Sequence, residues 1–176
     1  MGTRGAEIIE VSAAGAKMKT LIYGHYQSAK VPEVWGCAVH PTEQLYASCG
    51  SDHTIRIWNQ TQMVRASDPF KTDLTALDWS SDGTFIVAGD RMGFIHLIDP
   101  TTLKEIAQVG STLVGKSDNA WVEDLKISPD NTKVVFGSHG GLSKLEIVEI
   151  IGGKQLKPIK AADVKMTSAL THLDWS

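Results

Sequence analysis

The sequence repeats itself along most of its length, and this internal repeat limits the available folds more than any other feature. Val39, Trp79, Ile127 and Trp175 follow one another at steps of 40, 48 and 48 residues, and each stands near the end of an apolar segment. A turn rich in residues with a pre-set or positive φ follows the first three of them. These turns are His40-Pro41-Thr42, Ser80-Ser81-Asp82-Gly83 and Ser128-Pro129-Asp130-Asn131. A repeat of this period indicates a chain built from stacked structural units.

Each repeat contains four short apolar runs, which we predict to be antiparallel β-strands. Thr54–Trp58 shows the alternation of apolar and polar residues that a strand requires. The later runs of the three repeats are Leu45–Ser48, Thr54–Trp58 and Met63–Ala66; Phe85–Ala88, Phe94–Ile98 and Glu105–Val109; and Lys133–Phe136, Lys144–Val148 and Gln155–Lys160. Four strands in each repeat are typical of the blades of a β-propeller, and the period of two excludes helical HEAT or armadillo repeats. The sequence therefore predicts an all-β chain of propeller blades without helices.

The repeats also predict where the blades begin and end. We expect the last strands of a preceding blade in 1–24, full blades in 25–66, 67–109 and 110–165, and the first strand of a further blade in 166–176. The strands expected outside the full blades are Glu7–Val11, Met18–Tyr23 and Leu170–Ser176. Propellers close with about four to eight blades. We therefore expect an incomplete ring, from a fragment of a longer polypeptide, with unpaired strand edges at both ends.

Composition narrows the classes of function. The net charge is -3, with 42% hydrophobic and 21% charged residues, which is ordinary for a globular protein and gives no overall attraction to nucleic acid. No apolar run approaches the ~20 residues that span a membrane, and the N-terminus lacks the apolar region of a signal peptide. The two cysteines, Cys37 and Cys49, are too few for a disulfide framework. We expect a cytoplasmic protein without nucleic-acid or membrane partners.

The first full repeat resembles the WD repeat in the order and spacing of three short motifs. These motifs are Gly24-His25, Gly50-Ser51-Asp52 and Ile57-Trp58. In WD repeats a His, a Ser or Thr, an Asp and a Trp form a buried chain of hydrogen bonds, and each polar group then has a partner. The resemblance assigns this structural role to His25, Ser48, Asp52 and Trp58. A catalytic acid–base pair of His25 and Asp52 is the alternative interpretation. The second repeat has Ala88 and Ile98 in place of the Ser and Trp, so we expect the chain of hydrogen bonds in the first repeat only.

A closer resemblance is to the echinoderm microtubule-associated protein-like family. Glu33–Pro41 looks like its run ELWGLATHP, Gly2–Arg4 with Glu7–Val11 looks like its GTRDGEIIEV, and Thr171–Ser176 matches its THLDWS. The three matches lie in family order and bracket nearly the whole chain. The resemblance implies irregular propellers, two of them joined in the family, and binding to microtubules.

One motif favours a different class of protein. Gly110–Ser117 fits the P-loop pattern, in which backbone N–H groups cradle phosphates and a Lys neutralises their charge. That loop needs a strand before it and a helix opening at the Lys. The run Glu105–Val109 can be the strand, but Asp118-Asn119 and the strand-like Val122–Ile127 leave no room for the helix. We therefore expect a chance match, and we predict no nucleotide, no other cofactor and no enzymatic activity.

Metal binding and nucleophilic catalysis have less support in the sequence than nucleotide binding. The residues that could hold a metal show no tight pairs such as Cys-x-x-Cys; they are His25, His40, His53, His139, Cys37 and Cys49. No nucleophile motif of the Gly-x-Ser-x-Gly kind is present.

A group of lysines near the C-terminus is the remaining candidate for a contact. Lys154, Lys157, Lys160 and Lys165 fall within twelve residues that contain one acid, Asp163. They either protect an exposed outer strand from aggregation or contact an acidic surface such as that of tubulin. We predict a non-enzymatic scaffold that binds microtubules. A general protein–protein adaptor without a tubulin contact is the alternative. The sequence leaves open whether the site of action is cytoplasmic microtubules, the spindle or a ciliary axoneme.

Overall fold

The chain folds into stacked β-sheets, and the computed structural model describes residues 8–14, 17–21, 25, 33–112, 114, 120–138, 144–159, 164–165 and 170–175. Within these residues it contains 15 strands and no helix. The all-β prediction is therefore confirmed for the part of the chain that is described. No helix in this part is long and apolar enough to cross a membrane.

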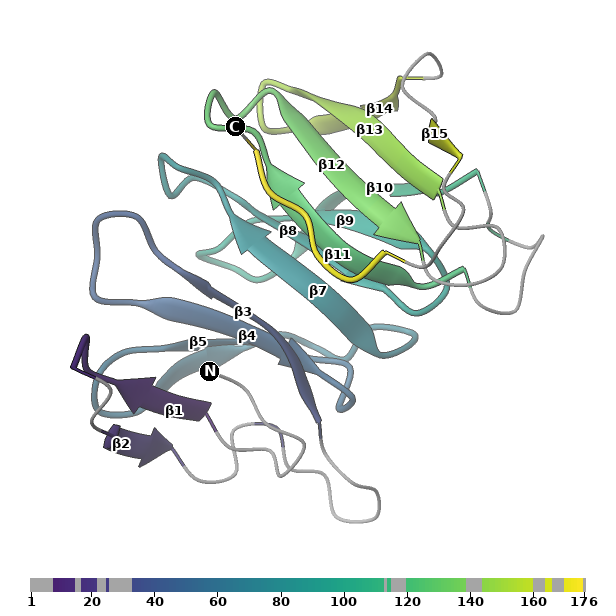
Figure 1. Cartoon of the computed structure of the whole chain (residues 1–176). Helices are drawn as coiled ribbons and strands as arrows, with labels where there is room; N and C mark the ends of the chain where they lie inside the picture. The colour runs from purple at the N-terminus through teal and green to yellow at the C-terminus, as the bar shows by residue number, and fades with distance from the viewer. Residues whose placement is uncertain are drawn as a thin grey trace.

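Three antiparallel sheets follow one another along the chain, and we call them blades 1, 2 and 3 (Figure 1). Blade 1 consists of β3 (Val34–Val39), β4 (Tyr46–Gly50), β5 (Ile55–Trp58) and β6 (Met63–Ala66). Blade 2 consists of β7 (Leu74–Trp79), β8 (Ile86–Asp90), β9 (Phe94–Ile98) and β10 (Glu105–Gly110). Blade 3 consists of β11 (Val122–Ile127), β12 (Lys133–Ser138), β13 (Lys144–Ile151) and β14 (Gln155–Pro158), with β15 (Val164–Lys165) also paired to β13. A two-stranded sheet of β1 (Ile8–Val11) and β2 (Lys17–Leu21) precedes them.

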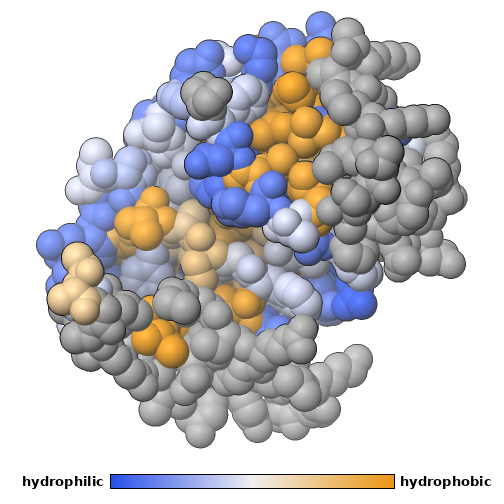
Figure 2. All heavy atoms as spheres, viewed as in Figure 1, coloured by the Kyte–Doolittle hydropathy of each residue, from blue (hydrophilic) through white to orange (hydrophobic). Residues whose placement is uncertain are grey.

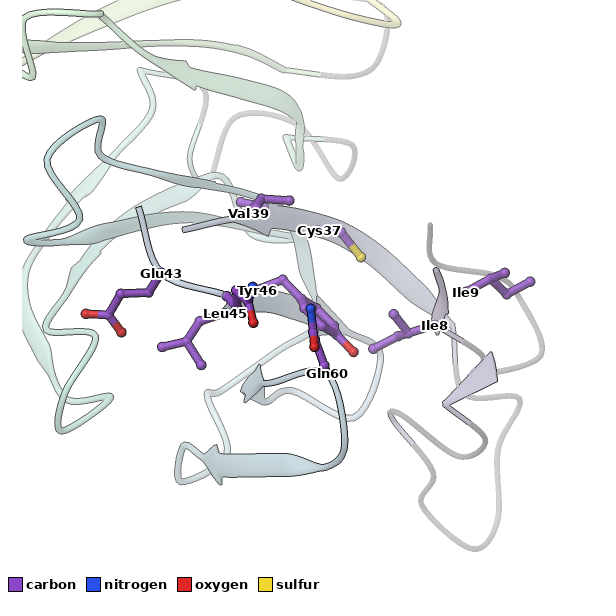
Figure 3. A pocket seen from close by; sticks show the side chains of 10 residues that line it. Ile8, Ile9, Cys37, Val39, Glu43, Leu45, Tyr46 and Gln60 are labelled. Carbon is purple, nitrogen blue, oxygen red and sulfur yellow. The ribbon is translucent and has the colours of Figure 1, made fainter. Parts of the chain in front are cut away.

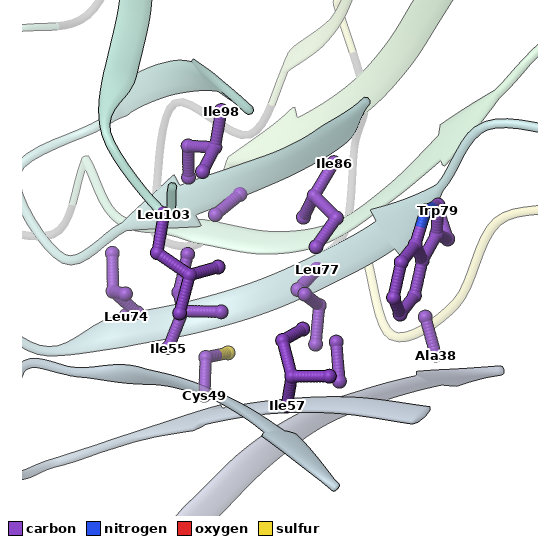
Figure 4. Packing of buried hydrophobic residues seen from close by; sticks show 12 residues of the cluster. Ala38, Cys49, Ile55, Ile57, Leu74, Leu77, Trp79, Ile86, Ile98 and Leu103 are labelled. Carbon is purple, nitrogen blue, oxygen red and sulfur yellow. The ribbon is translucent and has the colours of Figure 1, made fainter. Parts of the chain in front are cut away.

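The blades stack face to face through their inner strands. β3 packs against β7, and β7 packs against β11, so that the first strands of successive blades lie side by side (Figure 1). One apolar core lies between blades 1 and 2, where Ile55 and Ile57 meet Leu74 and Leu77 (Figure 4). A second core, between blades 2 and 3, includes Leu97 and Leu125. A four-stranded sheet has two faces to bury, and this stacking buries both faces of blade 2.

The turn between the first and second strands is built alike in blades 2 and 3. Gly83 and Asn131, which lie 48 residues apart, both adopt a left-handed backbone, with φ of 76° and 59°. Glycine and asparagine tolerate this conformation best. Asp130 caps the turn of blade 3 by accepting the backbone N–H of Thr132 at 3.0 Å. Hydrogen bonds from the Ser128 and Thr132 hydroxyls and from this N–H lower the pKa of Asp130 to about 2. The local turn chemistry in the sequence thus sets the strand connections.

Two apolar side chains pack on glycines of the preceding blade, one from β11 and one from the C-terminal segment. A Cβ atom on Gly89 would lie 2.5 Å from a methyl group of Val122, and a Cβ atom on Gly137 would lie 2.1 Å from a methyl group of Leu170. The two glycines and the two apolar residues are each 48 residues apart. The repeat therefore extends from the strands to the packing between blades.

The C-terminal segment differs from its predicted form. Leu170–Ser176 was expected to be a strand, but residues 170–175 form no β-ladder. They lie along β11, where Leu173 N donates to Asp124 Oδ2 at 2.8 Å and Trp175 Nε1 donates to the carbonyl of Lys126 at 3.0 Å (Figure 1). A ladder needs backbone pairing with a second strand, and these hydrogen bonds to β11 each involve a side chain instead.

The stack of blades does not close into a ring within the described residues (Figure 1). In the view of Figure 2, hydrophobic side chains reach the surface near β1 and β3 and over β12 and β13, the two sides on which the stack is open. The incomplete ring predicted from the sequence is consistent with this arrangement.

Candidate functional site

Four polar side chains meet in blade 1, and they are the four that the WD resemblance singles out. His25 Nδ1 lies 2.7 Å from Asp52 Oδ1, and His25 Nε2 lies 2.7 Å from Ser48 Oγ. Trp58 Nε1 donates to Ser48 Oγ at 2.8 Å. Since the indole N–H donates to Ser48, the hydroxyl can donate to His25 Nε2, and Nδ1–H can donate to the Asp52 carboxylate. Each donor then has an acceptor, as buried polar groups require.

Asp52 has further partners that the WD pattern does not include. Its Oδ1 accepts the backbone N–H and the hydroxyl of Thr54 at 3.1 and 2.9 Å, and its Oδ2 accepts Arg56 at 2.7 Å. Burial opposes ionisation of Asp52, but hydrogen bonds from His25 and Thr54 and the charges of His25 and Arg56 bring its pKa below the ordinary value. The carboxylate is therefore held as an anion within blade 1.

The burial of this network argues against a catalytic acid–base pair. His25 is 0% exposed and both of its ring nitrogens have protein partners. A general base must come within hydrogen-bond reach of its substrate, and no substrate atom can reach this imidazole without breaking the network. We therefore propose that the four residues have a structural role.

Blade 2 contains a different polar cluster, around His96 on β9. His96 Nδ1 lies 2.6 Å from Glu105 Oε2 on β10, and His96 Nε2 lies 3.3 Å from Asp90 Oδ2 at the end of β8. The ring of Phe70 packs edge-on against the imidazole, with centroids 5.3 Å apart. Because the two carboxylates lie on opposite ring nitrogens, they cannot bind one metal ion together with the imidazole. The described residues contain no group of three or more His, Cys, Asp and Glu that could hold a metal.

The position of His96 could have been found from the repeat. Arg56, His96 and Glu146 occupy the same place in the third strand of successive blades, at steps of 40 and 50 residues. All three are polar residues at a polar position in the alternation of the strand, and each of them binds different partners. The sequence analysis missed this position because the WD pattern does not contain it.

The His96 cluster predicts a dependence of stability on pH. Burial disfavours the charged ring, but hydrogen bonds to Asp90 and Glu105 and the charges of both carboxylates raise the pKa of His96 above its ordinary value. The resulting stabilisation is fully present below the unfolded-state pKa of about 6.5 and is lost as the pH rises through the folded-state pKa. His96→Asn should therefore lower the melting temperature more at pH 6 than at pH 9. Thermal unfolding at both pH values tests this; an equal loss at both would contradict it.

The P-loop match lies partly outside the described residues, which include 110–112 and 114 of it. Ser111 N donates to the carbonyl of Gly93 at 2.8 Å, and Thr112 N donates to Glu146 Oε2 at 3.0 Å. The Ser111 hydroxyl also donates to Glu146. These two N–H groups therefore serve protein acceptors, one of them a carboxylate, which would repel a phosphate group.

The lysines near the C-terminus are only partly within the described residues. Lys154, in the turn after β13, and Lys157, in β14, are exposed. Lys165 lies in β15, where its backbone pairs with Lys144. Lys160 lies outside the described residues. The exposed pair Lys154 and Lys157 is therefore the part of this group that the structure places on the surface.

Comparison with known proteins agrees with the assignment of blades 1 and 2. A family model described as WD domain, G-beta repeat, matches residues 15–59 and 65–99. With three stacked four-stranded units, this makes the chain a WD-repeat protein of the β-propeller class.

The comparison also finds individual proteins that are similar to the chain. The chain is 27% identical over 157 residues to echinoderm microtubule-associated protein-like 2 of Rattus norvegicus, which covers 89% of this chain and 22% of that protein. It is 24% identical over 164 residues to the 77 kDa echinoderm microtubule-associated protein of Lytechinus variegatus, covering 92% and 23%. It is 30% identical over 144 residues to the F-box-like/WD repeat-containing protein TBL1X of Mus musculus, covering 71% and 26%.

These matches confirm the resemblance predicted from the sequence. The WD repeats and these relatives support a place for the chain in the echinoderm microtubule-associated protein-like family of WD-repeat proteins. The chain spans about a quarter or less of the length of these relatives.

Proposed function

We propose that this chain is part of a scaffold that binds microtubules. The observation that carries the proposal is its similarity, over about nine-tenths of its length, to proteins named as microtubule-associated. The stacked blades support it, because a propeller offers wide, rigid surfaces made of loops and outer strands. Such a surface suits a large partner better than a small substrate.

The exposed lysines are the candidate contact with the microtubule. Lys154 and Lys157 lie on blade 3, in the last turn and the outer strand. Opposite charges across an interface steer association and add modest affinity. A contact of this kind weakens as salt rises, because the Debye length shortens to about 8 Å at 0.15 M ionic strength.

Co-sedimentation of the native protein with microtubules at several salt concentrations tests the proposal. We expect Lys154→Glu/Lys157→Glu to weaken binding about tenfold at low salt, since each exposed charge pair contributes up to about 1 kcal/mol. The double variant Lys71→Glu/Lys104→Glu makes the same change of charge at exposed positions before β7 and between β9 and β10 and should bind normally. The melting temperatures of both variants show whether they fold.

A general protein–protein adaptor is the alternative, because the fold alone does not determine the partner. Absence of the folded native protein from the microtubule pellet at low salt would favour that function. If the lysine variants pellet with microtubules as the native protein does, microtubule binding is retained but the contact lies on another surface.

A further inference from the structure

Stacking of the sheets buries their faces but leaves the ends of the strands open to other molecules. The groove between β1 and blade 1 belongs to the stacked faces, since Ile8 packs there in one apolar cluster with Tyr46 (Figure 3). The turn between β8 and β9 instead lies at a strand end and presents Arg91 and Met92. The Arg91 side chain and Met92 are each 53% exposed. A cation and an apolar side chain thus stand next to each other on an open surface.

The Arg91 guanidinium is held in place by neighbours from other parts of the chain. Its Nη1 donates to Asp73 Oδ2 at 3.0 Å, and its Cζ lies 5.3 Å from the centre of the Trp121 ring. Asp73 Oδ1 lies 3.0 Å from His53 Nε2, so both oxygens of this carboxylate have partners. An ion pair and an aromatic ring together fix the plane of a guanidinium. The cation is therefore pre-organised before any ligand binds.

Most of the hydrogen-bonding capacity of Arg91 is unused. A guanidinium carries several N–H donors, and within the described part of the chain one of those of Arg91 has an acceptor. Open donors on a fixed guanidinium match a carboxylate, which accepts two parallel hydrogen bonds. A phosphate suits the site less, because its higher charge would lie near Asp73 and because phosphates are usually bound by several basic residues. The turn therefore favours a carboxylate ligand.

Met92 lines a groove of about 470 Å³ that adjoins the same turn. The rings of Phe70 and Phe94 line it as well, and the imidazole of His96 engages the two carboxylates at its floor. Two of the three exposed charged residues that also line the groove are cations; they are Asp68, Lys71 and Lys104. Binding sites are typically grooves of roughly 300–1,000 Å³ with apolar walls and a few polar groups. The groove therefore suits an apolar side chain from a segment that is acidic elsewhere.

We propose that the β8–β9 turn binds an extended segment of a partner protein in which an acidic residue stands close to an apolar one. The carboxylate accepts from the open N–H groups of Arg91, and the apolar side chain enters the groove beside Met92. Arginine is among the residues that contribute most to binding at protein interfaces, especially beside a pocket that an apolar side chain fills.

This site is separate from the exposed lysines of blade 3. The equivalent turn of blade 3 comes before β13, whereas Lys154 follows the end of β13. Because a strand has its two ends at opposite sides of the sheet, Arg91 and Lys154 lie at opposite ends of the stack. The proposal therefore does not depend on the microtubule contact.

Selection of a phage-displayed library of random peptides on the chain of residues 1–176 tests the proposal. We expect the selected peptides to share an Asp or Glu close to an apolar residue. Their binding, measured by fluorescence anisotropy, should weaken by about tenfold or more in Arg91→Ala and in Arg91→Lys, which keeps the charge but loses the planar fork. Lys154→Ala, at the opposite end of the stack, is the control and should leave peptide binding unchanged.

A change in the peptide completes a double-mutant cycle. Replacement of its acidic residue by the corresponding amide should weaken binding to the wild-type chain by about tenfold and have little effect on Arg91→Ala, where the partner of the carboxylate is already gone. A purely structural role of Arg91 would not produce this dependence. Met92→Ser leaves the ion pair with Asp73 intact and should also weaken binding, so it provides the answer if the melting temperature of Arg91→Ala shows that this variant does not fold.

Three results would overturn the proposal. One is a selection that enriches no peptide, or peptides without an acidic residue. Another is binding that the Arg91 and Met92 variants leave unchanged. The third is tighter binding when phosphoserine replaces the acidic residue, which would make a phosphorylated segment the ligand.

Discussion

Gly89→Ala is expected to lower the free energy of unfolding by about 2 kcal/mol, although it adds a single methyl group. The new Cβ would lie 2.5 Å from one methyl carbon of Val122 and 2.6 Å from its Cβ. Val122 cannot move away easily, because it is completely buried in the core between blades 2 and 3. Extra volume in a packed core typically costs about 1–3 kcal/mol.

A double-mutant cycle separates this clash from other effects of the alanine. Val122→Ala alone should also destabilise, since it removes buried methyl groups. In Gly89→Ala/Val122→Ala the close contacts with the two γ-methyl groups are gone and only the contact with the Cβ of residue 122 remains, so the loss should be smaller than the sum of the single losses. Urea unfolding of the four proteins measures the coupling. Additive losses would mean that Gly89 and Val122 do not pack against each other.

Much of the fold could be predicted because its signals are local. The runs predicted at Met63–Ala66, Phe94–Ile98 and Val122–Ile127 coincide with β6, β9 and β11. Strand ends depend on more distant residues. β8 continues to Asp90 beyond the predicted Ala88, because Asp90 pairs with Leu74 across the sheet. Alternation within one strand cannot show how far its neighbour extends.

The C-terminal segment shows how a strand pattern can be present without a strand. Leu170, Leu173 and Trp175 stand 48 residues after Val122, Leu125 and Ile127, the buried residues of β11. The apolar pattern of an inner strand is therefore complete. Side-chain packing and two hydrogen bonds hold the segment against β11, but a β-ladder also needs a neighbouring backbone, which the pattern itself cannot supply.

The polar clusters also differ in whether the sequence alone could reveal them. His25, Ser48, Asp52 and Trp58 could be assigned together because the WD pattern relates all four. His96 and Glu146 could not, because their partners come from other strands and loops. Glu105 reaches His96 from the next strand, and Ser111 reaches Glu146 from the loop between blades. The three equivalent positions thus carry a cation (Arg56), an imidazole (His96) and a carboxylate (Glu146), and each side chain binds partners of its own surroundings.

The largest effect is expected in blade 1, where Asp52→Ala should lower the free energy of unfolding by about 3 kcal/mol at pH 7. The substitution leaves His25 and the side chain of Thr54 without their acceptor and Arg56 without its counter-charge. Removal of one partner of a buried network costs the desolvation of the groups that remain. Urea unfolding measures the loss. Asp82→Ala, at an exposed turn where the carboxylate accepts from Thr84, is the control and should cost less.

The pH dependence of this loss identifies the carboxylate as its origin. The folded state lowers the pKa of Asp52, chiefly through His25 and Thr54 acting against burial. Its contribution is therefore present above the unfolded-state pKa of about 3.9 and is lost as the pH falls through the folded-state pKa. The difference in unfolding free energy between wild type and Asp52→Ala should be constant near neutral pH and should shrink in acid. A difference that equals that of Asp82→Ala at pH 7 would mean that the four residues do not form a stabilising network, because a buried anion with these partners cannot be removed without a larger cost.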